Sequence, residues 1–255
     1  MMTQTFIFLL FDSYYMSSQR KRKTFDIFDQ KIYPLEKMLD EKRMPVLFVG
    51  AGISNRYTNA CTWTHLLESI AAKIGIDRFQ LNGIKKSLES DYPGVNIYPH
   101  LASKLSSMMM DQISSKQLTR DDFSDMPDDD WVMMEVCDPF KVLICSMLKT
   151  NRLTDDEIKL KELESFRMIT DKVPAVITTN YDDFLENEVF TNFETLVYPD
   201  DYYFSGSDGY GEILKIHGTI DAPDSIVITS EDYSKLNNNS KIILSRLTYL
   251  MCYHP

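Results

Sequence analysis

The sequence predicts an α/β fold with a mainly parallel sheet and helices on both faces of that sheet. Apolar runs with the character of buried strands recur along the chain, at 46–49, 175–179 and 213–216. Segments with helical spacing of apolar residues lie between these runs. Strands that alternate with helices are typical of parallel sheets, because each crossover helix covers one face of the sheet.

The first of these strands, at 46–49, is a continuous apolar run between a proline and a glycine turn. Such a run suits a strand that is buried on both faces. The turn reads Gly50-Ala51-Gly52, and the next helix is predicted over 62–74 with one apolar face. Strand, glycine turn and helix form the first half of a βαβ unit.

Residues 1–44 are predicted to be an N-terminal extension with a helix, and residues 45–255 the main domain. The apolar stretch 6–11 is too short to span a membrane, and no Lys or Arg precedes it. We therefore expect no membrane span and no signal peptide, but a loosely docked strand. Helical spacing over 24–43 predicts a helix that Pro34 kinks or splits.

The stretch at about 77–170 is predicted to be a helical insertion that forms a lid or a second layer. Helices are expected at 98–118, 138–149 and 154–169, and no long β-branched run interrupts them. The acidic piece at 120–130 lacks the spacing of a calcium loop, so it is interpreted as a solvated loop.

The strand pattern returns after the insertion. A helix capped by Asn180 or Asp182 is predicted to follow the strand at 175–179. A helix is also predicted at 241–251, close to the end of the chain. Three further short strands are expected at 196–198, 213–216 and 226–228.

Composition excludes several classes of function. The net charge of −11 disfavours general nucleic-acid binding, because an acidic surface repels phosphate backbones. None of the four cysteines is spaced as Cys-x-x-Cys, which excludes a four-cysteine zinc ribbon. Four cysteines are also too few for a disulfide scaffold, so a reducing cytoplasm is the expected location.

Three polar or glycine-rich pieces follow predicted strands, where ligands collect in a parallel sheet. The first is Gly50-Ala51-Gly52-Ile53-Ser54, whose glycines allow a pyrophosphate to approach the backbone. The third glycine of the dinucleotide fingerprint is absent, with Asn55 in its place, so a simple tight turn is an equal alternative.

The other two pieces carry polar side chains. Asn180 has a donor and an acceptor that suit a ribose hydroxyl or a water, and Asp182 lies two residues further on. The alternative for both residues is a helix cap. His217 is the best proton acceptor at neutral pH, with a reference pKa near ~6.5, and its alternative is a polar residue that closes a strand.

Together the pieces resemble the sirtuin-like family, in the stretches "VLFVGAGIS" (46–54), "VITTNYDDFLE" (176–186) and "ILKIHGTID" (213–221). The resemblance implies a Rossmann-like fold that binds NAD. It implies that Gly50, Ala51 and Gly52 hold the phosphates and that Ser54 lies near the adenosine. It also implies that Asn180 and Asp182 face the nicotinamide ribose and carboxamide, and that His217 is the catalytic base.

Two branches of the family differ in the residues after the first motif. Protein deacylases carry a Pro-Asp-Phe-Arg run and a zinc module, whereas this chain reads "NRYTNACTW" after Ser54. The segment "SIVITSEDY" (225–233) resembles the NAD-consuming effector domains of bacterial anti-phage defence. The resemblance therefore implies an NAD hydrolase for which NAD is the substrate, with no zinc.

Several alternatives to the hydrolase stay open at this point. The domain could bind NAD or ADP-ribose as a sensor without cleaving it, or be a truncated remnant. A deacylase or ADP-ribosyltransferase is a third interpretation. In the family another strand follows the "EDY" segment, so we expect the last strand to be missing here. A homo-oligomer, or a separate sensor or effector chain, is the expected partner besides NAD.

Overall fold

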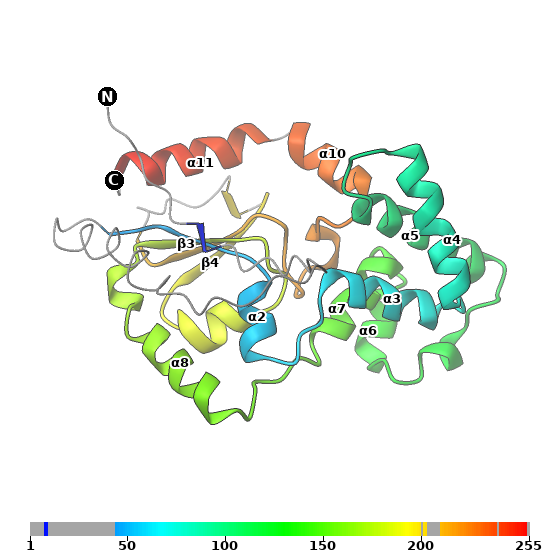
Figure 1. Ribbon diagram of the computed structural model, residues 1–255, viewed down its shortest axis with the longest axis horizontal. Coiled ribbons are helices and arrows are strands. Elements are labelled where there is room, and N and C mark those ends of the chain that lie inside the picture. Colours follow the sequence, from blue (N-terminus) through cyan, green and yellow to red (C-terminus); the bar gives the residue numbers. More distant parts are fainter. Residues whose placement is uncertain (1–7, 10–43, 200, 203–209, 239, 254–255) are drawn as a thin grey trace, which may run out of the picture.

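The computed structural model describes residues 8–9, 44–199, 201–202, 210–238 and 240–253. These residues form a five-stranded sheet in the order β1-β2-β3-β5-β4, in which every pair of neighbours is parallel (Figure 1). The predicted α/β class is confirmed. The strands are β1 (Phe8–Leu9), β2 (Leu47–Val49), β3 (Ala175–Thr178), β4 (Glu194–Val197) and β5 (Glu212–Lys215).

Helices cover both faces of the sheet, as the sequence predicts (Figure 1). Successive strand residues point to opposite faces, so Val176 and Ile177 belong to different apolar clusters. Val176 packs with α2 (Gly52–Tyr57), α8 (Glu157–Arg167) and the π-helical turn η3 (Leu185–Val189). Ile177 packs with α11 (Ser240–Tyr253), which confirms the helix expected at 241–251.

Residues 63–148, between β2 and β3, form a layer of helices with a core of its own, which we call the helical lobe. The apolar face predicted for the helix at 62–74 is buried, at Leu66, Leu67, Ile70 and Ala71 in α3 and at Ile74, its C-cap. The lobe contains α3 (Trp63–Lys73), α4 (Arg78–Asp91), α5 (Tyr98–Ser114), the 3₁₀ turn η1 (Arg120–Phe123), α6 (Asp128–Met133) and α7 (Pro139–Leu148).

Four helices of the described chain were not predicted: α2, α4, α6 and α10 (Ser230–Asn238). The short α2 begins directly at the glycine turn, whereas the first helix was expected only at 62. Helix α4 begins with a capping box in which Asp77 and Gln80 bind each other's backbone N–H groups. Ser/Thr/Asp followed three residues later by Glu/Gln is a known start signal, so the sequence did carry the information for α4.

The interpretation of 120–130 as a solvated loop is wrong in part. Phe123 and Met126 are buried in the core of the lobe, and Asp130 is buried beside Lys149, with 2.9 Å between the charged atoms. Phe123 and Met126, which lie among the carboxylates in the sequence, anchor this stretch to the lobe. It therefore forms η1 and the first turn of α6.

The strand expected at 226–228 is also wrong. Its apolar side chains are buried, but the segment belongs to no described sheet ladder, and Ile226 and Ile228 join the core of the helical lobe. The 3₁₀ turn η4 (Pro223–Ser225) precedes the segment and α10 (Ser230–Asn238) comes after it. A further short turn, η2 (Thr170–Lys172), leads into β3.

At the N-terminus, β1 pairs in parallel with β2, which agrees with the strand expected there. The helix predicted over 24–43, and most of the extension 1–44, lie outside the described residues.

Candidate functional site

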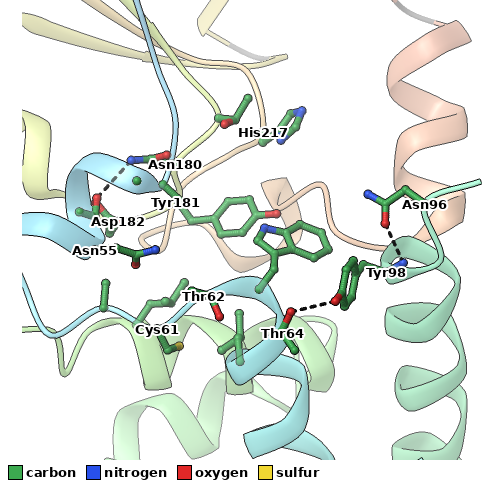
Figure 2. A pocket seen from close by; sticks show the side chains of 18 of the residues that line it. Asn55, Cys61, Thr62, Thr64, Asn96, Tyr98, Asn180, Tyr181, Asp182 and His217 are labelled. Carbon is green, nitrogen blue, oxygen red and sulfur yellow. Dashed lines mark hydrogen bonds between the residues drawn. The ribbon is translucent and has the colours of Figure 1, made fainter. Parts of the chain in front are cut away.

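A cavity of about 640 Å³ lies at the carboxyl ends of β2, β3 and β5, between the sheet and the helical lobe (Figure 2). The predicted residues Ala51, Gly52, Ser54, Asn180, Asp182 and His217 all line it. Gly50 contributes a backbone carbonyl, which accepts from Asn180 Nδ2 at 3.3 Å. The three pieces predicted from the sequence therefore meet at one cavity.

Asn180, Ser54 and Asp182 form a connected group at one end of the cavity (Figure 2). Asn180 Nδ2 donates to Ser54 Oγ at 3.1 Å, and Ser54 Oγ donates to Asp182 Oδ1 at 3.0 Å. Thr178 supports the group from the strand below, because its hydroxyl accepts from Asn180 N and donates to Val49 O. The side chain of Asn180 is thus held by Gly50 and Ser54, which follow β2, and its backbone by Thr178 on β3.

The side-chain oxygen of Asn180 has no hydrogen-bond partner among the described residues, although it is buried. Its orientation follows from chemistry: the carbonyl of Gly50 can only accept, so the amide nitrogen must face it. Buried acceptors are nearly always satisfied in proteins. Asn180 lines the cavity, so its unpaired oxygen is a candidate acceptor for a hydrogen-bond donor of a ligand.

Asp182 has a structural role as well as a place in the cavity. Its Oδ1 accepts from the N–H of Phe184 at 3.2 Å, so it caps the turn after β3, as the alternative interpretation held. Burial raises the pKa of Asp182, opposed by the hydrogen bond from Ser54 and by the nearby Lys215. Lys215 is fully buried on β5, donates to Asp182 O at 2.7 Å, and pairs with Glu186.

His217 stands two residues beyond β5 and is partly buried. Its ring meets the ring of Tyr233 edge to face, with 5.4 Å between centroids. Burial lowers the pKa of His217 to about 4. No carboxylate among the described residues pairs with the imidazole, and the lowered pKa keeps the ring uncharged at neutral pH.

The helical lobe supplies the other end of the cavity, which sequence reasoning missed. Asn96 and Tyr98 lie there across from Asn180, and the Tyr98 hydroxyl accepts from Thr64 Oγ1 at 2.9 Å (Figure 2). The remaining lining residues are mostly small or aromatic: Asn55, Ala60, Cys61, Thr62, Trp63, Leu66, Leu148, Thr179, Tyr181 and Tyr233. No Lys or Arg of the described chain is among them.

In a comparison with protein families, residues 174–255 match the family described as the SIR2-like domain. This part of the chain is similar to a sirtuin-like domain. SIR2-like domains are commonly NAD-dependent enzymes, which indicates an NAD-related function in general. No curated protein matches the chain in sequence.

The match to the sirtuin-like domain covers β3, β4 and β5 together with Asn180, Asp182 and His217. The glycine turn lies outside the matched residues. The structure nonetheless joins the turn to the matched part, through the bonds from Asn180 to Gly50 and Ser54. The resemblance noted at 46–54 therefore has a physical counterpart in the cavity wall.

Membrane spans and metal clusters are both absent from the part of the chain that the structure describes. None of the helices there combines the length and the apolar character that crossing a bilayer demands. Within the same residues, no group of three or more His, Cys, Asp or Glu side chains is gathered as metal ligands would be.

Proposed function

We propose that this chain is an NAD hydrolase that cleaves the bond between nicotinamide and ribose. The observation that carries the proposal is that one cavity is lined both by Asn180, whose side-chain oxygen is unpaired, and by the imidazole of His217. The sirtuin-like match supports NAD as the substrate. A cavity walled by small and aromatic residues suits a ligand that consists of planar rings and sugars.

In the proposed reaction, a water oxygen bonds to C1′ of the ribose as the bond from C1′ to nicotinamide breaks. Nicotinamide leaves as a neutral molecule with the electron pair of that bond, so it needs no proton. The proton of the water passes to the imidazole of His217. General-base assistance of this kind contributes about 10²–10⁴-fold to the rate. The products are nicotinamide, ADP-ribose and one proton.

Asn180 and Asp182 would orient the substrate in this scheme. The Asn180 oxygen accepts a hydrogen bond from the ribose or the attacking water. The second carboxylate oxygen of Asp182, which no described residue binds, accepts one from the carboxamide N–H₂. Holding the reacting groups in place in this way can account for a large share of a rate enhancement.

The phosphates would lie at the turn formed by Gly50, Ala51 and Gly52. Since no described cationic side chain lines the cavity, backbone N–H groups of the turn are the donors available for them. Ser54 links Asn180 and Asp182 through its hydroxyl, which accepts from the first and donates to the second. Its proximity to the adenosine stays a prediction.

The test is release of nicotinamide from NAD by the purified chain. We expect release by the wild type, and none by His217→Ala or Asn180→Ala while both variants stay folded by circular dichroism. His65→Ala is the matched control, because His65 is exposed on α3 and does not line this cavity. Wild-type turnover in His217→Ala would disprove the assignment. Binding without release would point instead to a module that senses NAD or ADP-ribose.

We extend the proposal to defence against phage, on the strength of the resemblance to bacterial effector domains. In that role the enzyme works in the cytoplasm and depletes NAD upon infection, alone, as a homo-oligomer or with a sensor chain. The test is phage challenge of cells that express the chain. Protection that is lost in His217→Ala supports the role, and equal protection by both forms contradicts it.

A further inference from the structure

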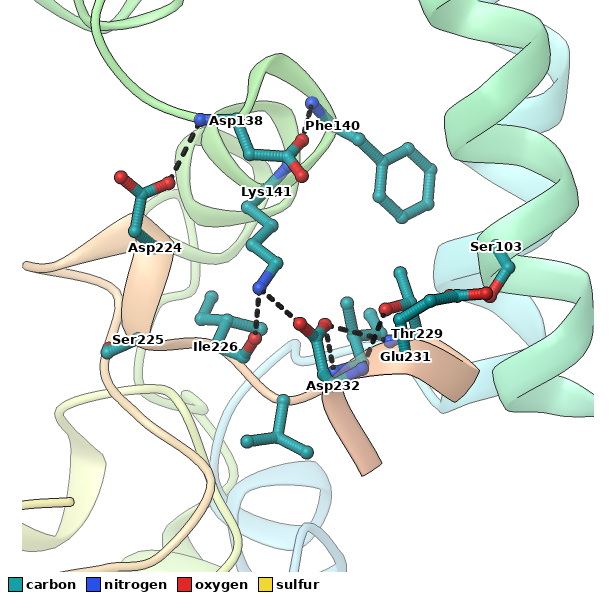
Figure 3. A network of polar contacts seen from close by, with 12 residues as sticks. Ser103, Asp138, Phe140, Lys141, Asp224, Ser225, Ile226, Thr229, Glu231 and Asp232 are labelled. Atoms are coloured by element: carbon teal, nitrogen blue, oxygen red, sulfur yellow. Dashed lines mark hydrogen bonds and ion pairs between the residues drawn. The ribbon is translucent and has the colours of Figure 1, made fainter. Parts of the chain in front are cut away.

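The segment that comes after His217 is held by a buried ion pair that comes from the helical lobe. Residues 226–229 are buried, yet they pair with no strand of the described sheet. Their backbone groups are bound instead by the side chains of Lys141, in α7, and Asp232, in the first turn of α10 (Figure 3).

The geometry of this pair is well defined. Lys141 Nζ donates to Ile226 O at 2.7 Å and to Asp232 Oδ1 at 2.8 Å. The other oxygen of Asp232 accepts from the N–H groups of Ile228, at 3.2 Å, and Thr229, at 3.1 Å. Lys141 and Asp232 are only 7% and 9% exposed. One ammonium and one carboxylate thus satisfy backbone groups that a strand partner would otherwise satisfy.

Stability alone is a poor explanation for such a pair. Removing two charges from water is costly, and an apolar pair of similar volume often stabilises a protein equally well. What an apolar pair cannot do is bind the backbone at Ile226, Ile228 and Thr229. The pair therefore fixes where the segment lies. Further contacts add to it at either end: Asp138 N donates to Asp224 (Figure 3), and Ser230 N donates to Ser103.

The held segment contacts the backbone of His217, and the residue after Asp232 contacts its ring. Val227 N donates to His217 O at 3.0 Å, while Val227 O accepts from the buried hydroxyl of Tyr181 at 2.7 Å. Tyr233, the neighbour of Asp232, meets the imidazole edge to face and lines the cavity. Both the backbone and the ring of His217 are thus in contact with residues that the ion pair locates.

We propose that the Lys141–Asp232 pair is the device by which the helical lobe positions the imidazole of His217 in the cavity. Neither residue lines the cavity, so both are positioning residues and neither is catalytic. Their effect on turnover rests on the proposed NAD cleavage. The contacts by which they hold Val227 and His217 do not depend on NAD cleavage. These contacts can be measured without any substrate.

The test compares Lys141→Met with Lys149→Met. Lys149 caps the end of the same helix and pairs with Asp130 inside the lobe, away from the segment that carries Val227. In the ligand-free protein, Lys141→Met should speed amide exchange at Val227 and shift the NMR signals of the His217 ring. Lys149→Met should leave both unchanged. Asp232→Asn, which keeps the side-chain shape, provides the same test if Lys141→Met folds poorly.

Kinetics give a second measurement on the same variants. Lys141→Met should lower kcat by about 10- to 100-fold with a smaller change in KM, as expected when a reacting group is displaced. The positioning role is overturned if Val227 exchange and the His217 signals are unchanged in Lys141→Met and Asp232→Asn, or if Lys149→Met perturbs them equally. If the wild type releases no nicotinamide, the hydrolase proposal fails, and the exchange and NMR results still decide this one.

Discussion

The side-chain amide of Asn180 donates to the hydroxyl of Ser54 at 3.1 Å, although the two residues are 126 positions apart in the chain. The bond joins the end of β3 to α2, the short helix that begins at the glycine turn after β2. Ser54 extends this network, because its hydroxyl donates a hydrogen bond to Asp182 Oδ1. The polar end of the cavity is therefore one hydrogen-bonded unit, and disturbing its central hydroxyl should disturb both neighbours.

We predict that Ser54→Ala lowers NAD cleavage by about 10- to 100-fold, because the Asn180 amide loses a partner that fixes its orientation. The buried groups left unpaired should also lower the free energy of unfolding by about 1–3 kcal/mol. Nicotinamide release and urea unfolding measure the two effects. Ser165→Ala is the control, since that hydroxyl donates within the exposed helix α8. Unchanged turnover in Ser54→Ala would show that the unit does not orient Asn180.

Gly218 should tolerate no side chain. Its φ is +87°, and a Cβ atom there would lie 2.3 Å from the carbonyl oxygen of Ser225. We expect Gly218→Ala to cost about 3 kcal/mol or more of unfolding free energy, from strain and overlap together. Gly75 has a similar φ of +73° with no atom within 4 Å of the added carbon, so Gly75→Ala should cost only about 1 kcal/mol. Equal costs in urea unfolding would contradict the close approach.

The pKa of His217 predicts how stability depends on pH. Burial lowers that pKa to about 4, against 6.5 for an unperturbed histidine. As pH falls from 6.5 towards 4, the unfolded chain binds a proton that the folded protein does not bind. The free energy of unfolding therefore decreases over this window, and it stops decreasing on this account below about pH 4.

His217→Gln removes this contribution, so wild type should lose more stability than the variant between pH 7.5 and pH 5. Unfolding by urea at the two pH values measures the difference, and other titrating groups cancel in the comparison. An equal loss in both proteins would mean that His217 titrates as an ordinary exposed histidine.

The location of the site could be predicted from the sequence, because it depends on topology. Parallel strands place their carboxyl ends at one edge, so Gly50, Asn180 and His217 had to approach one another once the strands were recognised. The apolar face of α3 could be predicted for a similar reason, since helical spacing alone determines which side chains share a face.

What depends on packing between distant elements could not be predicted. Residues 226–228 have the composition of a strand, but the helical lobe buries them and Lys141 binds their backbone. Lys141 is one cation in an otherwise apolar helix, and no local pattern reveals which carboxylate it pairs with. Trp63 and Tyr98 line the cavity from the lobe, and their place there also depends on packing between distant elements.

Trp63 offers a direct view of ligand binding. The chain has two tryptophans. Trp63 lines the cavity, while Trp131 packs against Phe123 inside the lobe, with 5.8 Å between the ring centroids. In Trp131→Phe, the remaining emission should change when NAD or ADP-ribose binds. In Trp63→Phe, the emission should stay constant, because Trp131 does not line the cavity.

Stacking of a base on an aromatic ring is worth about 1–3 kcal/mol, so Trp63→Ala should weaken binding by that amount in calorimetry. A response that comes from Trp131 alone would place the nucleotide elsewhere and contradict the cavity as its site.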